Sequence, residues 1–179
     1  MFMGLTEDIC MQAWKIVLAS VEYAAKEGVT NKQAGTIVVL DPAYGTVLFQ
    51  AHVDDTHPNA NEYHRIALAK AHVCWKTKLS SRVVQQSAPH LYEVGMTKWG
   101  GGVIENGLVV SFSGVQAVYD EAIAWSVLHW IVAICQNEMT KPDGTMAEAS
   151  SYVGGLSPLE LAAFMDAAGA EVERQLNEG

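Results

Sequence analysis

One local arrangement occurs twice in the chain: a long helical pattern followed by two short β-rich runs that a tight turn joins. The clearer turn, Asn106-Gly107, follows the run 103–105 and precedes the run 108–113. Asn-Gly between two such runs is the strongest short-range signal of a β-hairpin. The earlier runs, 36–40 and 46–51, are separated by a segment with Pro early and Gly late, which predicts a second antiparallel connection.

Three long segments have helical periodicity, and they alternate with these hairpins. They cover residues 5–27, about 61–80 and about 117–138. Thr6 is placed to cap the first of them, and Gly28 to end it. The order helix, two strands, helix, two or more strands, helix predicts an α+β fold, with an antiparallel sheet covered by helices.

The end of the chain has a pattern of its own. Lys141-Pro142-Asp143-Gly144 breaks the preceding helix, and Ser157-Pro158-Leu159-Glu160 combines an N-cap, a Pro at the first helical position and a capping-box Glu. We therefore expect a core domain over 1–139. A C-terminal helical extension over 140–179 is expected to pack on the core or on a neighbouring subunit.

The charge content limits the class of protein. The 179 residues include 11 Lys and Arg against 20 Asp and Glu, and only 17% of the chain is charged while 50% is hydrophobic. The acidic balance argues against a nucleic-acid binder, which needs a basic face. So few charges would leave apolar surface uncovered on a monomer, which predicts an oligomer.

Targeting and cysteine patterns complete the general picture. The first twenty residues lack the basic-then-apolar order of a signal peptide, and no apolar run of membrane-spanning length is recognised. Cys10, Cys74 and Cys135 form no C-x-x-C pair, and Cys74 is expected to be a buried thiol. We expect a cytoplasmic protein with reduced thiols that does not interact with a membrane.

The densest polar stretch, 52–64, contains six residues of metal-ligand type, and the candidate metal ligands among them are His52, Asp54 and His57. Imidazole and carboxylate groups at short spacing are usual ligands of Zn or non-haem Fe. His52 and Asp54 would leave a strand on the same face, because strand side chains alternate. The other interpretation is a solvated loop in which Asp54 or Asn59 caps the next helix. No strict metal motif is present, and both interpretations stay open.

His64 lies on a predicted helix, where it shares a face with Leu68, Ala71 and Trp75. A neutral imidazole against an apolar wall with an aromatic neighbour is suited to binding haem. The alternative is a histidine of the core or of an interface whose hydrogen bonds are satisfied within the protein.

Trp99 directly precedes three consecutive glycines, Gly100, Gly101 and Gly102. Glycines let a ligand lie against bare backbone, and their amides can hold an anion. No Gly-Lys-Ser/Thr follows, so the motif is not a phosphate loop. We place a candidate small-molecule site beside this turn.

Four pieces in this order resemble the GlcG-like family, also described as haem-degrading domain or HbpS-like proteins. They span about residues 9–135. The first two are the helix ending in Glu27-Gly28-Val29 and the strand unit that runs from Asp41 and Gly45 to Ala51-His52-Val53-Asp54. The other two are the helix segment Ala67-Leu68-Ala69-Lys70-Ala71 and the Gly101-Gly102 hairpin followed by Asp120-Glu121-Ala122. Two departures mark a divergent member. Val103-Ile104 stands where the family has Pro, and Gly114-Val115-Gln116-Ala117 stands where it has Gly-Val-Ser-Gly.

The resemblance implies a profilin-like fold, with a five-stranded antiparallel sheet between helices, and assembly into larger oligomers. It also implies that haem or a related tetrapyrrole is the ligand. On that interpretation His64, or else His52 or His57, binds the iron, and Trp75, Trp99 and the glycine turn shape the pocket.

Three functional hypotheses follow from these observations. The first is a small-ligand-binding protein of the GlcG-like family that degrades, carries or senses haem. The second is a metal-dependent enzyme, or the small subunit of one, which acts on a small organic molecule with His52, Asp54, His57 and an Fe or Zn ion. The third is a structural partner subunit of a hetero-oligomer with an operon neighbour, with its apolar surface buried against another chain. The assembly expected otherwise is a homo-oligomer. Whether the protein is an enzyme stays open.

Overall fold

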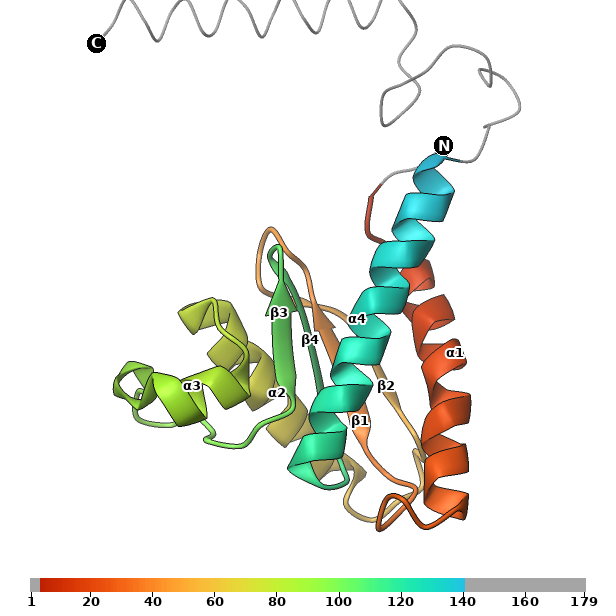
Figure 1. Ribbon diagram of the computed structural model, residues 1–179, viewed down its shortest axis with the longest axis horizontal. Helices are drawn as coiled ribbons and strands as arrows, with labels where there is room; N and C mark the ends of the chain where they lie inside the picture. The colour runs from red at the N-terminus through yellow and green to blue at the C-terminus, as the bar shows by residue number, and fades with distance from the viewer. Residues whose placement is uncertain (1–3, 141–179) are drawn as a thin grey trace, which may run out of the picture. The chain divides into compact units, whose positions relative to one another are not determined.

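Four antiparallel strands form the sheet of this fold, in the order β2-β1-β4-β3 (Figure 1). The strands are β1 (Thr36–Leu40), β2 (Val47–His52), β3 (Gly102–Glu105) and β4 (Leu108–Ser113). The computed structural model describes residues 4–140, and the sheet belongs to the compact unit formed by Leu5–Ile134. The predicted helical extension, 140–179, lies outside the described residues but for Thr140.

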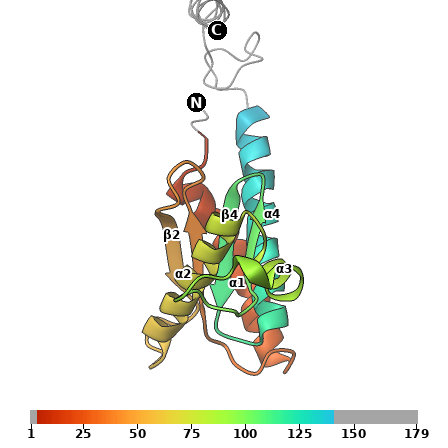
Figure 2. The same cartoon turned by 90° about the vertical axis from the view of Figure 1, so that its left-hand side faces the viewer.

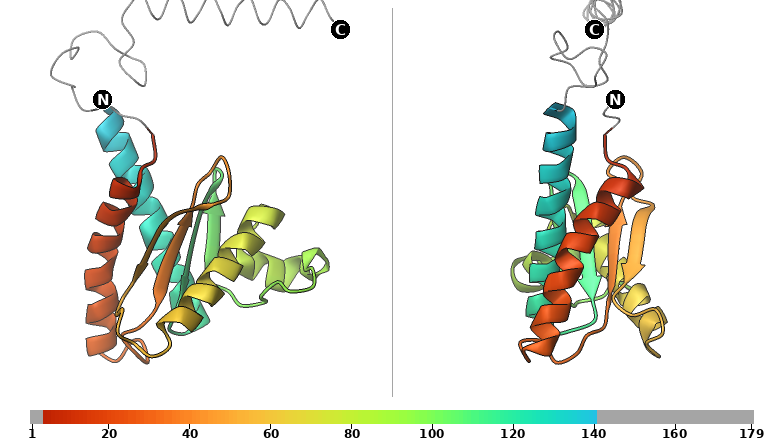
Figure 3. Two further views of the ribbon diagram at one scale, coloured as in Figure 1. Left: turned by 180° about the vertical axis from the view of Figure 1, so that it is seen from behind. Right: turned by 90° about the vertical axis from the view of Figure 1, so that its right-hand side faces the viewer.

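Helices cover both faces of the sheet. The helical elements are α1 (Glu7–Lys26), α2 (Ala60–Thr77), α3 (Ser81–Ser87), the short 3₁₀ helix η1 (Pro89–Leu91) and α4 (Ala117–Thr140). Helices α1 and α4 lie on one face, whereas α2 lies on the other face with α3 beside it (Figures 2 and 3). The predicted α+β fold is therefore confirmed.

The β3–β4 connection is the hairpin that the sequence predicted. Asn106 and Gly107 have φ angles of +48° and +86°. Positive φ at both central residues is the requirement of a type I′ turn, whose twist matches that of the two strands. The predicted cap of α1 is also present, since Thr6 Oγ1 accepts the Ile9 N–H at 3.3 Å. Local turn and cap chemistry therefore sets the ends of these elements.

The central strand β1 carries the core on both of its faces, because all five of its residues are buried. Val38 and Leu40 pack with the α2 residues Ala67, Ala71 and Cys74. On the opposite side of the sheet, the ring of Phe112 from β4 lies 6.1 Å from the ring of Trp14 in α1. A strand covered on both faces reads as a continuous apolar run, as Thr36–Leu40 does.

Two details differ from the sequence expectation. Residues 4–140 contain four strands rather than the predicted five, and the profilin-like assignment is not shown. The segment between β2 and β3 instead forms α2, α3, η1 and coil. Its last part contains Pro89 and Gly95, which interrupt a strand, and it has no alternation of apolar and polar residues. The short helix α3 was not predicted either.

Helix α4 carries apolar residues on most of its sides, although Ser126 and His129 are exposed on it. One stretch of the described residues, Ala117–Met139, is long and apolar enough to cross a membrane by length and composition, and only 33% of its apolar window is buried. The sequence prediction overlooked this stretch. The buried side chains are Ala124, Val127, Leu128 and Ile131, which repeat at helical spacing as in a core helix. The opposite, exposed side of α4 is therefore also apolar.

Candidate functional site

A buried ion pair joins α2 to α4. Lys70 Nζ lies 2.8 Å from Asp120 Oδ2, and the two side chains are only 2% and 4% exposed. Lys70 also donates to the Phe112 carbonyl at 3.0 Å, and Asp120 Oδ1 accepts the Val115 N–H at 3.0 Å. Burial lowers the pKa of Lys70 and raises the pKa of Asp120, because each charge has lost water, and the attraction between them opposes both shifts. The pair ties the two helices and the end of β4 together.

The glycines before β3 make room for this ion pair. Gly101 has a φ of +113°, and a Cβ there would lie 2.7 Å from Asp120 Cβ and 2.9 Å from Lys70 Nζ. A Cβ at Gly102 would lie 2.8 Å from Cys74 Sγ. The bare backbone of these two glycines is therefore covered by side chains of the same chain. Gly100 is buried as well.

Cys74 has no chemical role in this arrangement. Burial raises the pKa of its thiol to about 12, and its side chain packs in the core between α2 and the sheet. A thiol with such a pKa is almost fully protonated at neutral pH, and only the thiolate is nucleophilic. The prediction of a buried thiol is confirmed.

The predicted metal ligands His52, Asp54 and His57 each have a local partner. His52 Nδ1 shares a hydrogen bond with Thr36 Oγ1 at 2.7 Å. Asp54 Oδ1 accepts the Thr56 N–H at 2.8 Å and the Thr56 hydroxyl at 2.7 Å, which lowers the pKa of Asp54. His57 Nδ1 accepts the Asn59 N–H at 3.1 Å.

These three side chains shape the loop between β2 and α2. Within residues 4–140, no group of three or more His, Cys, Asp and Glu side chains is placed to hold a metal ion. The predicted metal centre is thus not assembled among these residues: His52 bonds to Thr36 on the adjacent strand β1, and Asp54 and His57 bond within the loop. The solvated-loop interpretation describes Asp54 better, although Asp54 stabilises its own turn and does not cap α2.

His64 differs from these residues. Its Nε2 atom is buried and has no hydrogen-bond partner among residues 4–140, and its ring lies 6.3 Å from the ring of His52 in an edge-on arrangement. Buried polar atoms in folded proteins are nearly always hydrogen-bonded, so an unpaired one calls for a functional or structural explanation. The hypothesis of a satisfied core histidine does not describe this nitrogen.

The predicted cofactor residues lie at two places along α2. His64 is near its N-terminal end, beside His52. Trp75 follows eleven residues later, or about 16 Å along a helix, where it packs against Gly45 and under Lys78. Gly102 also contacts this C-terminal half of α2, at Cys74. Trp99 is 57% exposed.

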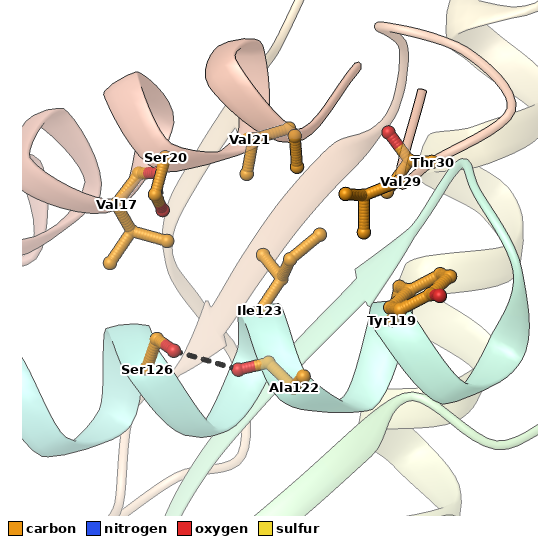
Figure 4. A pocket seen from close by; sticks show the side chains of 10 residues that line it. Val17, Ser20, Val21, Val29, Thr30, Tyr119, Ala122, Ile123 and Ser126 are labelled. Carbon is orange, nitrogen blue, oxygen red and sulfur yellow. Dashed lines mark hydrogen bonds between the residues drawn. The ribbon is translucent and has the colours of Figure 1, made fainter. Parts of the chain in front are cut away.

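A groove that the sequence prediction missed lies between α1 and α4 (Figure 4). Its volume is about 190 Å³. It is lined by Val17, Ser20, Val21, Ala24, Val29, Thr30, Tyr119, Ala122, Ile123 and Ser126. Small residues on both helices leave the gap, and in the sequence they are spaced at helical intervals. That spacing was a usable signal, although small residues also allow two helices to pack closely.

Comparison with known proteins gives a class of fold. No family model matches the chain, and no curated protein matches it. Solved structures that share its fold are those of DUF336 or GlcG-like proteins, so the resemblance seen in the sequence is confirmed at the level of the fold.

Three solved structures illustrate this likeness. The first is protein ORFY from Klebsiella pneumoniae, of the DUF336 family, with a TM-score of 0.50 and 21% identity, over 68% of this chain and 89% of that one. A double mutant of HbpS from Streptomyces reticuli has a TM-score of 0.52 and 20% identity, over 70% and 86%. PduOC in its complex with haem has a TM-score of 0.51 and 16% identity, over 71% and 94%. Modest scores at low identity mark this chain as a divergent relative in fold.

Proposed function

We propose that this chain binds haem or a related tetrapyrrole, with His64 as the ligand of the iron. The observation that carries the proposal is the buried, unpaired Nε2 of His64. Haem iron takes axial ligands from His, Cys, Met or Tyr, and a neutral imidazole needs one free ring nitrogen for this role. The fold shared with PduOC, whose structure holds haem, supports the same ligand class.

The donor chemistry at His64 fits haem better than it fits a bare metal ion. A bare Zn or Fe ion takes several protein ligands, and residues 4–140 offer no such group. Haem needs one axial imidazole and apolar surroundings, since the porphyrin supplies four ligands itself. Bound haem would supply a redox-active iron. His64 would hold it on one side, and the partly buried Leu68 on the same helix face would help to exclude water. Because Nε2 is buried, iron reaches it only when the surrounding side chains move.

A haemin titration of the purified full chain tests this function. We expect a sharp Soret shift that saturates at a fixed stoichiometry, and His64→Ala should weaken binding. Removing even an outer-shell partner typically costs about 10–100-fold in metal affinity, so losing the ligand itself should cost at least as much. His72→Ala is the matched control, because His72 is exposed on the same helix and should bind normally.

The possible outcomes distinguish a failure of haem binding from a failure of the role given to His64. A spectrum that never saturates and ignores both substitutions contradicts haem binding. Saturable binding that His64→Ala leaves unchanged contradicts only the role of His64.

We further propose that the chain forms a homo-oligomer through the exposed apolar end of α1 and α4. Met11, Ile16, Trp130 and Val132 are 37%, 44%, 44% and 37% exposed. From Ala122 to Asn137 the helix contains no Asp, Glu, Lys or Arg. A charge-free apolar face of this kind marks a surface for association, and a second copy is the partner that is always present.

Native mass spectrometry tests this assembly. We expect the wild-type chain to run as an oligomer and Trp130→Glu to shift it to the monomer, because a buried unpaired carboxylate is costly. Val83→Glu is the control, since Val83 is similarly exposed, at 43%, but lies on α3. A wild-type monomer, or association only with the product of a neighbouring gene, would contradict the proposal.

A further inference from the structure

The groove between α1 and α4 has no part in the proposed haem site. Its lining among the described residues includes no His, Cys or Met, and none of the residues that the sequence predicted to bind a cofactor or metal. The two helices meet there with opposite directions, so that Val17 is near Ser126 at one end and Val29 is near Tyr119 at the other (Figure 4). Ile123 points from α4 toward Val21.

Most of the polar side chains that line the groove already form hydrogen bonds within the protein. Ser20 Oγ donates to the Val17 carbonyl at 2.6 Å, and Ser126 Oγ donates to the Ala122 carbonyl at 2.8 Å. Thr30 Oγ1 donates to the Lys32 carbonyl at 3.3 Å. These hydroxyls are therefore turned toward their own backbone, and the surface that they leave in the groove is apolar.

Tyr119 is the exception among the polar residues of the groove. Its hydroxyl forms no hydrogen bond with other described residues, and its side chain is partly buried at one end of the groove. It can donate one hydrogen bond and accept another. The groove thus has one polar anchor and otherwise apolar walls.

Charge and size limit the ligand further. No Asp, Glu, Lys or Arg lines the groove, so a charged ligand would lose water without gaining a partner. An apolar cavity of about 150 Å³ holds benzene. The volume here is about 190 Å³, which suits one aromatic ring with a substituent or two fused rings.

We propose that the α1–α4 groove is a binding site for a neutral aromatic molecule of one or two rings that carries one hydrogen-bonding group. Val21, Val29 and Ile123 would contact the ring, and the Tyr119 hydroxyl would bind the polar group. This site is separate from His64, and its ligand needs no iron.

Calorimetric titration of the metal-free full chain with indole tests the site. Indole is neutral, has two fused rings and carries one N–H. We expect saturable binding, which Ala122→Leu should weaken at least about tenfold by filling the groove, in line with the cost of overpacking. Ala133→Leu is the matched control, because Ala133 is exposed on the same helix outside the groove and should leave the affinity unchanged.

Two further measurements test the hydrogen bond to Tyr119 and the preference for a neutral ligand. Tyr119→Phe should weaken indole by about 3–10-fold, the usual worth of one hydrogen bond, while the affinity for benzene stays the same. Indole-3-acetate should bind at least about tenfold more weakly than indole, because its carboxylate has no partner. No saturable indole binding, or an affinity that Ala122→Leu and Tyr119→Phe both leave unchanged, would overturn the proposal. Neither outcome bears on haem.

Discussion

Lys70→Met should lower the free energy of unfolding by about 3–5 kcal/mol, the usual cost of removing one partner from a buried ion pair. Methionine fills a similar volume but leaves the Asp120 carboxylate buried at 4% exposure, with its backbone partners as the only compensation. Since a domain is stable by only about 5–15 kcal/mol, this loss is large. Urea unfolding, followed by far-UV circular dichroism, measures it directly.

The double variant Lys70→Met with Asp120→Asn tests the coupling. Asparagine removes the charge but keeps an amide oxygen that can accept the Val115 N–H. We expect it to be more stable than Lys70→Met alone. Lys76→Met is the control, because the Lys76–Glu93 pair is exposed and should be worth under about 1 kcal/mol. The single variant Asp120→Asn completes the comparison. If the double variant loses as much free energy of unfolding as the two single variants together, the two groups are not coupled.

Gly101→Ala should destabilise the fold by about 2–6 kcal/mol. A residue with a side chain pays about 1–3 kcal/mol for an unusual positive φ, and overpacking a tight core adds about 1–3 kcal/mol. The φ here is +113°, and the new methyl group would lie 2.7 Å from Asp120 Cβ and 2.9 Å from Lys70 Nζ. It would therefore press directly on the ion pair. Thermal and urea unfolding both report the loss.

Gly95→Ala separates backbone strain from crowding. Gly95 has a similar φ of +91°, but a Cβ there would meet nothing within 4 Å. Only the strain applies, so we expect a loss of about 1–3 kcal/mol, smaller than the loss at Gly101. Equal losses at the two positions would mean that crowding against Lys70 and Asp120 contributes nothing.

The parts of the fold that depend on local chemistry were predictable. The Asn106-Gly107 turn, the Thr6 cap and the apolar run of β1 each have a physical signature within a few residues. The strand count was not predictable in this way, because the fifth strand was inferred from resemblance. The segment before β3 forms short helices and coil here, with Pro89 breaking any strand pattern.

The site was predicted less well, because the residues that meet there lie far apart in the sequence. His64 was singled out because its helix face is visible in the sequence, and its role as a ligand stays a prediction. The Lys70–Asp120 pair joins residues 50 positions apart, and no local pattern announces such a contact. Its only trace was a lysine inside the apolar segment Ala67–Ala71. The glycine turn was assigned to a ligand, whereas Gly101 and Gly102 are packed against this pair and Cys74. The α1–α4 groove also depends on two helices about a hundred residues apart.

The central claim is that His64 binds the iron of haem, and an imidazole rescue of His64→Gly tests it most directly. The glycine variant should lose the saturable Soret shift of the wild type. Added imidazole should then restore the saturable Soret shift of the wild type, because a free ring can occupy the space that the side chain leaves and supply the missing nitrogen. His72→Gly is the control and should need no imidazole. A His64→Gly variant that keeps the wild-type spectrum without imidazole would contradict the account.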